Sequence, residues 1–263
     1  MASCSTTLQD REHILASLTK YNQHLTTIIQ KTADDVIINP TEPTEDKFHK
    51  ILSQLIPCLT ECYQAIGARN SLEFYRNLNI ESDEVSAVMK KMDGLTARYH
   101  EMLSKVDDVI QNEGPKDLRL SEIILIDVLT NEAFSFETIL QQKKYTILVV
   151  LVTFNSIHEG ASWLERTPTD YQLLSDTHKH IYKLLNMKRS YYKTWHSTAI
   201  HYYTEKLVNN AKLIKPLIHD DLEQTGGDVI LDKSCNILYT HYSEATIDRP
   251  TAEELLHVVN SLN

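Results

Sequence analysis

Apolar residues recur at three- and four-residue intervals through the first part of the chain, which predicts amphipathic helices. The predicted helices cover residues 8–31, 48–66, 71–78 and 82–110. Pro40 and Pro43 separate the first two helices, and Pro57 should kink or divide the second. Regular helices joined by short connections are typical of a helical bundle.

The pattern changes after Gly114 and Pro115, where the helical period ends. Runs rich in apolar and β-branched residues now predict strands, at residues 120–129, 145–154, 228–232 and 236–242. The last two of these runs should form an antiparallel hairpin. The run 145–154 stops abruptly at Asn155 and Ser156, which predicts a strand buried on both faces, followed by a turn into a helix.

Helical patterns alternate with these strands, at residues 160–166, 176–187, 190–209 and 251–262. Thr251 and Glu254 follow Pro250 as a capping box for the final helix. This order of elements predicts a mixed sheet flanked by helices. We therefore expect an α+β protein, with a helical bundle domain over residues 1–115 and a second domain over residues 116–263.

Composition and charge narrow the class of protein. The chain has 263 residues, of which 42% are hydrophobic and 24% charged, close to the average of globular proteins. Its net charge is -10 and both halves are acidic, which argues against a nucleic-acid partner. No run of 18 apolar residues predicts a membrane span, and the first residues do not resemble a secretory signal. We expect a cytoplasmic protein without a membrane partner.

The four cysteines are Cys4, Cys58, Cys62 and Cys235, and a cytoplasmic location predicts that they stay reduced. Cys58 and Cys62 share a helix face, so they could bind a metal, form a sensor disulfide or be two small residues of the core. We favour core residues.

Several motifs in the second half occur in an order that suggests a known family. They are "LLSD" at residues 173–176, "IYKLLNMKRSYYKTWH" at 181–196, "TGGDVILD" at 225–232 and "LDKSCNILYTHYSEATIDRPTAEELL" at 231–256. Together they resemble thioredoxin-like domains of the AhpC/TSA (peroxiredoxin-like) antioxidant group over residues 117–263. Residues 1–116 resemble no family that we can name.

This resemblance implies a thioredoxin fold with a catalytic cysteine directly after residue 154, where a helix dipole would lower the pKa of the thiol. The sequence has no cysteine between Cys62 and Cys235. About twenty residues separate Phe154 from "LLSD", which resembles a shortened branch of the group. Some relatives of that form carry a cysteine soon after "WLE", where this chain has Thr169 or a neighbour. We interpret the domain as degenerate, and Cys235 as a turn residue rather than a substitute thiol.

Ser156, His158 and Glu159 lie where the catalytic thiol would be expected. His158 and Glu159 suggest an acid/base pair, and Ser156 with His158 suggests part of a nucleophilic arrangement. Polar residues at a helix start also simply cap the helix, and this is the simpler interpretation.

Aromatic residues concentrate between positions 188 and 206, at Tyr191, Tyr192, Trp195, Tyr202 and Tyr203. Basic residues interleave with them, as in proteins that stack single-stranded bases, but the acidic charge of the domain argues against this. We expect half of these rings to pack on the sheet and the others to bind a protein partner or a small apolar ligand.

Other candidate sites have simpler explanations. His178 and His180 are two residues apart, and His196 and His201 are five apart, so neither pair shares a helix face as metal ligands would. The basic residues Lys188, Arg189 and Lys193 suggest an anion site or a solvated face. Gly226 and Gly227 precede a strand without the lysine of a phosphate loop, so we expect them to allow close backbone approach. We predict neither a metal nor a cofactor.

The sequence thus favours a redox-inactive thioredoxin-like protein that binds a protein partner or a small apolar ligand. The first alternative is a non-thiol enzyme that uses His158 and Glu159 on a small organic substrate. The second is thiol-dependent antioxidant activity by family analogy. The apolar surface of the helix at 48–66 also suggests a homodimer formed through the N-terminal helices.

Overall fold

The computed structural model describes residues 8–35, 52–78, 82–109, 119, 122–135, 137–138, 150–213, 221–232, 234–245 and 247–261. The chain divides into two compact units. The helical unit combines Met1–Gln111 with Tyr191–Leu213, and the sheet unit combines Asn112–Ser190 with Ile214–Asn263. The sequence pattern suggested one boundary near residue 115, whereas the chain crosses between the units three times.

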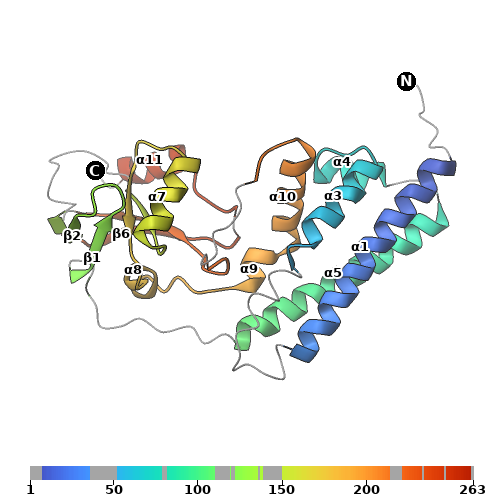
Figure 1. Ribbon diagram of the computed structural model, residues 1–263, viewed down its shortest axis with the longest axis horizontal. Coiled ribbons are helices and arrows are strands. Elements are labelled where there is room, and N and C mark those ends of the chain that lie inside the picture. Colours follow the sequence, from blue (N-terminus) through green and yellow to red (C-terminus); the bar gives the residue numbers. More distant parts are fainter. Residues whose placement is uncertain are drawn as a thin grey trace. The chain divides into compact units, whose positions relative to one another are not determined.

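The described helices of the helical unit are α1 (Leu8–Asp35), α3 (Leu55–Ala65), α4 (Ser71–Asn77), α5 (Asp83–Val109), α9 (Tyr191–Trp195) and α10 (Ser197–Val208). The long helices α1 and α5 lie side by side (Figure 1), and α3 packs against both α1 and α10. Leu18, Leu25, Leu59, Tyr63 and Leu103 are almost completely buried. The apolar faces predicted from the sequence therefore form a shared core.

Local signals determine where these helices begin. The chain turns at Ser53 and Gln54 before α3, so Pro57 lies in the first turn of a helix, where its missing N–H is tolerated. The predicted helix 48–66 thus begins anew at Leu55, two residues before Pro57, and its first residues, 48–51, lie outside the described part of the chain. The Ser82 hydroxyl accepts a hydrogen bond from Val85 N at 3.4 Å before α5, and the Asn70 side chain accepts one from Glu73 N at 2.9 Å at α4.

The stretch 190–209, predicted as one helix, forms the two helices α9 and α10. They break at His196, whose backbone is extended. Tyr191 and Trp195 are buried within the helical unit, where Tyr99 Oη donates to Trp195 O at 2.9 Å. The expectation that half of these rings pack on the sheet is therefore wrong.

The sheet unit contains a four-stranded sheet in the order β2-β1-β4-β3. Its strands are β1 (Ile124–Asp127), β2 (Ala133–Ser135), β3 (Val150–Thr153) and β4 (Gln172–Ser175). β3 and β4 are parallel and are connected by α7 (Ile157–Arg166), while β1 is antiparallel to both β2 and β4. β5 (Gly227–Leu231) and β6 (Ile237–Tyr242) form the predicted antiparallel hairpin.

The remaining helices are α8 (His180–Leu184), which is shorter than the predicted 176–187, and α11 (Ala252–Ser261). The capping box of α11 is confirmed, since Thr251 N donates to Glu254 Oε2 at 2.7 Å and Glu254 N donates to Thr251 Oγ1 at 3.2 Å. Among the helices that the structure describes, none combines the length and apolar character needed to cross a bilayer.

The core of the sheet unit joins β1, β4 and α8 through Ile123, Leu125, Leu174, Ile181 and Leu185. Side chains of β3 and of the hairpin pack against this cluster. The fold class predicted from the sequence, helices followed by a mixed sheet with flanking helices, is confirmed as α+β.

Two details of the sheet differ from the sequence prediction. Leu151 and Val152 are half-buried rather than buried on both faces, and residues 145–149 lie outside the described part of the chain. The short strands β2 and β4 were not predicted. They have only three and four residues, too few for a clear alternation of apolar and polar positions.

Candidate functional site

The carboxyl ends of the parallel strands β3 and β4 meet at Thr153 and Ser175, which are paired in the register. Ser175 Oγ donates to Asn155 O at 2.6 Å, and Asp176 N donates to Thr153 O at 2.7 Å. These bonds attach the turn after β3 to the end of β4. Ligands of open α/β sheets bind at such an edge, so we regard it as the candidate site.

Ser156 is the N-cap residue of α7, and its side chain forms a capping box with Glu159. The Glu159 carboxylate accepts hydrogen bonds from Ser156 N at 3.0 Å and from Ser156 Oγ at 2.8 Å, while Glu159 N donates to Ser156 Oγ at 3.3 Å. The two side chains thus satisfy N–H groups at the helix start. The structural role that we favoured for Ser156 and Glu159 is the one that their contacts support.

His158 does not join this arrangement. Its side chain is exposed, and it has no hydrogen-bond partner within the described part of the chain. The structure therefore brings Ser156 and Glu159 together and leaves His158 apart from them.

Asp176 is a residue of this edge that the sequence analysis did not select. Its side chain is only 1% exposed, and its carboxylate accepts hydrogen bonds from His180 N at 2.9 Å and Ile181 N at 2.7 Å. Asp176 thereby satisfies two N–H groups at the start of α8. The position of an aspartate directly after "LLS" and shortly before a helix was the signal that could have identified it.

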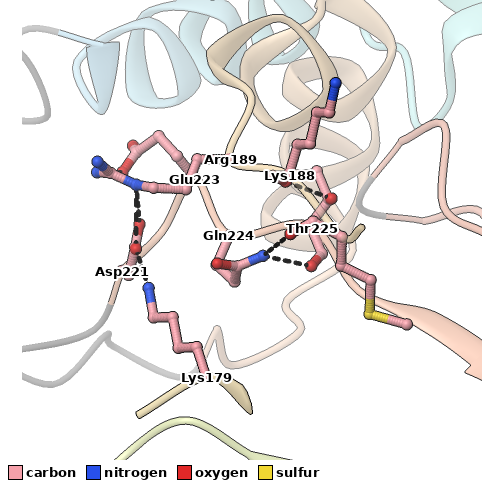
Figure 2. A network of polar contacts seen from close by, with 8 residues as sticks. Lys179, Lys188, Arg189, Asp221, Glu223, Gln224 and Thr225 are labelled. Carbon is pink, nitrogen blue, oxygen red and sulfur yellow. Dashed lines mark hydrogen bonds and ion pairs between the residues drawn. The ribbon is translucent and has the colours of Figure 1, made fainter. Parts of the chain in front are cut away.

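A network of charged side chains continues from this edge (Figure 2). Asp221 lies between Lys179 and Arg189 and forms ion pairs with both; the Arg189 Nε–Asp221 Oδ2 distance is 3.0 Å. Arg189 Nη2 also lies 3.6 Å from a carboxylate oxygen of the buried Glu223. The Lys179 ammonium lies 4.7 Å from the centre of the Phe154 ring, which links the network to the turn after β3.

Burial by itself raises the pKa of Asp221, but the hydrogen bond from Lys179 and the charge of Arg189 outweigh it and hold that pKa below its usual range. Backbone pairing accompanies the ion pairs, because Thr225 N and Oγ1 both donate to Lys188 O. The charges of Lys179 and Arg189 are thus balanced by carboxylates. This balance supports a structural role over the anion site that Arg189 suggested.

The two glycines at the start of β5, Gly226 just before it and Gly227 as its first residue, allow close approach, as predicted. A Cβ atom on Gly227 would lie 2.4 Å from the backbone oxygen of His241, and one on Gly226 would lie 2.6 Å from Arg249 Nη2. Arg249 itself pairs with Asp228 at 3.0 Å. These contacts join the "TGGD" and "DRP" motifs of the sequence around the hairpin.

The cysteines that the structure describes are Cys58, Cys62 and Cys235, and all three are free thiols. Cys58 and Cys62 are buried core residues of α3, and burial raises the pKa of Cys62 to about 12. Cys235 lies in the β5–β6 turn with a φ of 62°, and burial together with Glu137 and Asp232 raises its pKa as well. A raised pKa disfavours the thiolate that peroxide chemistry requires.

The aromatic candidates do not form one surface. Tyr191 and Trp195 are buried, while Tyr192 is 37% and Tyr202 36% exposed. Tyr203 lies edge-on to Tyr202 with ring centres 5.5 Å apart. Only part of the predicted ligand-binding set is therefore accessible.

No group of three or more His, Cys, Asp or Glu side chains in the described part of the chain could hold a metal ion. The hollow between β6 and α11 is lined by Tyr239, Thr251, Glu253, Glu254, His257 and Val258. None of these residues belongs to the turn after β3.

No curated protein and no solved structure is detectably similar to this chain. Residues 135–245 match the family described as AhpC/TSA antioxidant enzyme, and this span includes β3, α7, β4 and the β5–β6 hairpin. The resemblance inferred from the sequence motifs is thus confirmed over residues 135–245, which match this antioxidant domain family.

Proposed function

We propose that the AhpC/TSA domain of this protein does not act through a thiol and instead binds a protein partner or a small apolar ligand at the carboxyl edge of β3 and β4. The observation that carries this proposal is the capping box of Ser156 and Glu159. A catalytic thiolate at this position would need the partial positive charge of the α7 N-terminus. Here the Glu159 carboxylate already interacts with that charge.

The properties of Cys235 support the same proposal. Its pKa is raised, and it lies in the hairpin turn rather than at a helix start. Among the described cysteines, thiol-dependent antioxidant activity by family analogy would have to use this residue or the more deeply buried cysteines of α3; Cys4 lies outside the described part of the chain. We therefore rank it below a binding function.

The acid/base alternative assigns chemistry to His158 and Glu159 on a small organic substrate. A Glu159 carboxylate oxygen is already occupied by hydrogen bonds from Ser156 N and Ser156 Oγ, so it is less available to a substrate. His158 has the exposure that a general acid would need, but the described residues supply no group that orients it. The binding function remains our preferred proposal.

A peroxidase assay tests the loss of thiol chemistry. Purified full-length protein is mixed with hydrogen peroxide and dithiothreitol, and peroxide consumption is compared with that of Cys235→Ser and of buffer. We expect all three rates to agree. Consumption above the buffer rate that the Cys235→Ser variant abolishes would contradict the proposal.

Native mass spectrometry tests the binding function and the predicted homodimer in one measurement. A retained mass that disappears on denaturation would support a small ligand, and a Glu159→Ala variant should retain less of it if the ligand lies at the α7 start. The subunit count reports association through the N-terminal helices. A monomer would contradict the predicted homodimer.

A further inference from the structure

Two histidines of the helical unit stack on each other. His100 of α5 and His196, the N-cap residue of α10, have ring centres 3.9 Å apart and ring planes inclined by 18°. The Tyr192 ring lies edge-on to both, at 5.9 Å from His100 and 5.1 Å from His196. We call His100 and His196 the histidine pair.

Both rings accept hydrogen bonds from the backbone at the start of α10. Ser197 N donates to His100 Nε2 at 3.2 Å, and Thr198 N donates to His196 Nδ1 at 3.3 Å. An imidazole nitrogen accepts only when it carries no proton, whereas both nitrogens of an imidazolium are donors. These contacts are those of two neutral rings, with the proton on Nδ1 of His100 and on Nε2 of His196. Thr198 Oγ1 also lies 3.0 Å from His196 Nδ1 and is the donor to it in this tautomer.

Protonation would disrupt this arrangement in three ways. It would remove the acceptors of Ser197 N and Thr198 N, which lie in the first turn of a 12-residue helix. It would place a positive charge at the positive end of the helix dipole. If both rings were protonated, two like charges would face each other at 3.9 Å.

Among the residues that the structure describes, no carboxylate contributes to the pKa of either ring in a way that would offset these costs. Burial, and secondarily His196, lowers the pKa of His100 to about 4, and burial also lowers the pKa of His196. Asp107, on the same helix as His100, accepts hydrogen bonds from Tyr191 N and Tyr192 N instead.

The elements around the pair also carry charged side chains, among them Arg98, Glu101 and Lys105 of α5 and Lys193 of α9, and Glu101 pairs with Lys105 at 2.7 Å. Tyr99 of α5 lies 6.0 Å from His100 between ring centres. Burial, and secondarily Tyr21 of α1, raises the pKa of Tyr99. On the α3 side of α10, Tyr63 Oη lies 2.6 Å from His201 Nδ1. Glu205 of α10 accepts a hydrogen bond from Ser71 N, and Glu61 of α3 pairs with Lys20.

We propose that the histidine pair is a pH-sensitive clasp, which holds the first turn of α10 against α5 at neutral pH and releases it in mild acid. Only the neutral rings make the hydrogen bonds that close it. On release, the hydrogen bond from Tyr99 to Trp195 O still links α5 to the C-terminal end of α9. The expected result is therefore a local opening, not unfolding of the helical unit.

The direction of the effect follows from the lowered pKa values. A histidine whose pKa is lower in the closed form stabilises that form fully above its ordinary pKa of about 6.5, and loses this contribution as the pH falls towards the lowered value. For His100, a pKa of about 4 predicts an opening constant about 20-fold larger at pH 5 than at pH 7. Because this ring is partly exposed, solvent screening reduces the effect, and we expect about 5- to 20-fold.

Hydrogen exchange of the Ser197 and Thr198 amides tests the clasp in the full-length protein. After correction for intrinsic exchange rates, wild-type protection should fall by this factor between pH 7 and pH 5. The double variant His100→Gln/His196→Asn retains amide oxygens as acceptors, but these groups do not titrate. Its protection should change by less than about 2-fold.

Two controls separate the clasp from other histidines. His13→Gln removes an exposed histidine of α1 and should leave the wild-type response intact. His201, whose pKa burial also lowers to about 4, is tested by His201→Gln, which should likewise retain the response at Ser197 and Thr198. An undiminished response in the double variant would overturn the proposal.

Nuclear magnetic resonance of the wild-type rings gives an independent test that does not depend on how the variants fold. Both histidines should titrate below about pH 6.5, and their nitrogen shifts should place the proton on Nδ1 of His100 and on Nε2 of His196. Titration of either ring at or above the ordinary value, or the opposite tautomers, would refute the clasp.

Discussion

Replacement of Asp176 by alanine tests whether the candidate edge of the sheet depends on a buried carboxylate. The wild-type side chain is 1% exposed and accepts hydrogen bonds from His180 N and Ile181 N. Alanine would leave both N–H groups without their acceptor at the start of α8. Water cannot readily replace it, because Ile181 is itself buried.

The magnitude follows from the two lost hydrogen bonds. Bonds to a charged acceptor contribute about 1.5–3 kcal/mol each, and loss of an N-cap side chain costs about 0.5–2 kcal/mol. We expect Asp176→Ala to destabilise the sheet unit by about 3 kcal/mol, which lowers amide protection about 100-fold. Asp176→Asn keeps one acceptor oxygen and the shape of the side chain, so it should lower protection only about 10-fold.

Hydrogen exchange of the β4 amides is a suitable assay, because β4 pairs with both β1 and β3 and reports on the sheet unit alone. Asp170→Ala is the matched control, since Asp170 is exposed and precedes the same strand. It should change protection by less than about 3-fold. If Asp176→Ala were as mild as this control, the role of the Asp176 carboxylate as acceptor for the first N–H groups of α8 would be wrong.

Two further predictions test the packing of each unit. Gly227→Ala should destabilise the sheet unit by about 3 kcal/mol, because its Cβ would lie 2.4 Å from His241 O. Gly94→Ala places its Cβ with no atom within 4 Å and should stabilise α5 by about 0.5–1 kcal/mol. Chemical denaturation measures the free energy of unfolding of both variants, and equal effects would contradict the close approach at Gly227. Iodoacetamide at pH 8 should modify Cys235 before the buried Cys62, which should react only on unfolding; rapid modification of Cys62 in the folded protein would contradict its burial and raised pKa.

Much of the fold could be predicted because its signals are local. The helices of the first half carry apolar faces along many turns. α3 begins two residues before Pro57, and α5 begins directly after Ser82. The β5–β6 hairpin and the capping box at Thr251 depend on residues close in sequence. The short strand β4 was not predicted, because four residues are too few to show an alternation of apolar and polar positions.

The candidate site was predicted only in part. The turn at Ser156 follows an apolar run, so its place could be read from the sequence. The contacts of Glu159 could be anticipated as a capping box, since it lies three residues after a serine. Asp221 could not be linked to Lys179 and Arg189, because they are 42 and 32 residues away.

The sequence by itself determined the α+β class, the long amphipathic helices, the hairpin and the family resemblance, because each depends on periodicity or on motifs within short stretches. Tertiary structure decided that residues 191–213 join the helical unit, and that His100 meets His196 across 96 positions of the chain. It also decided which tyrosines are buried. The physical reason is that burial and side-chain pairing depend on which distant faces of the chain pack together. The local sequence around each residue does not determine that packing.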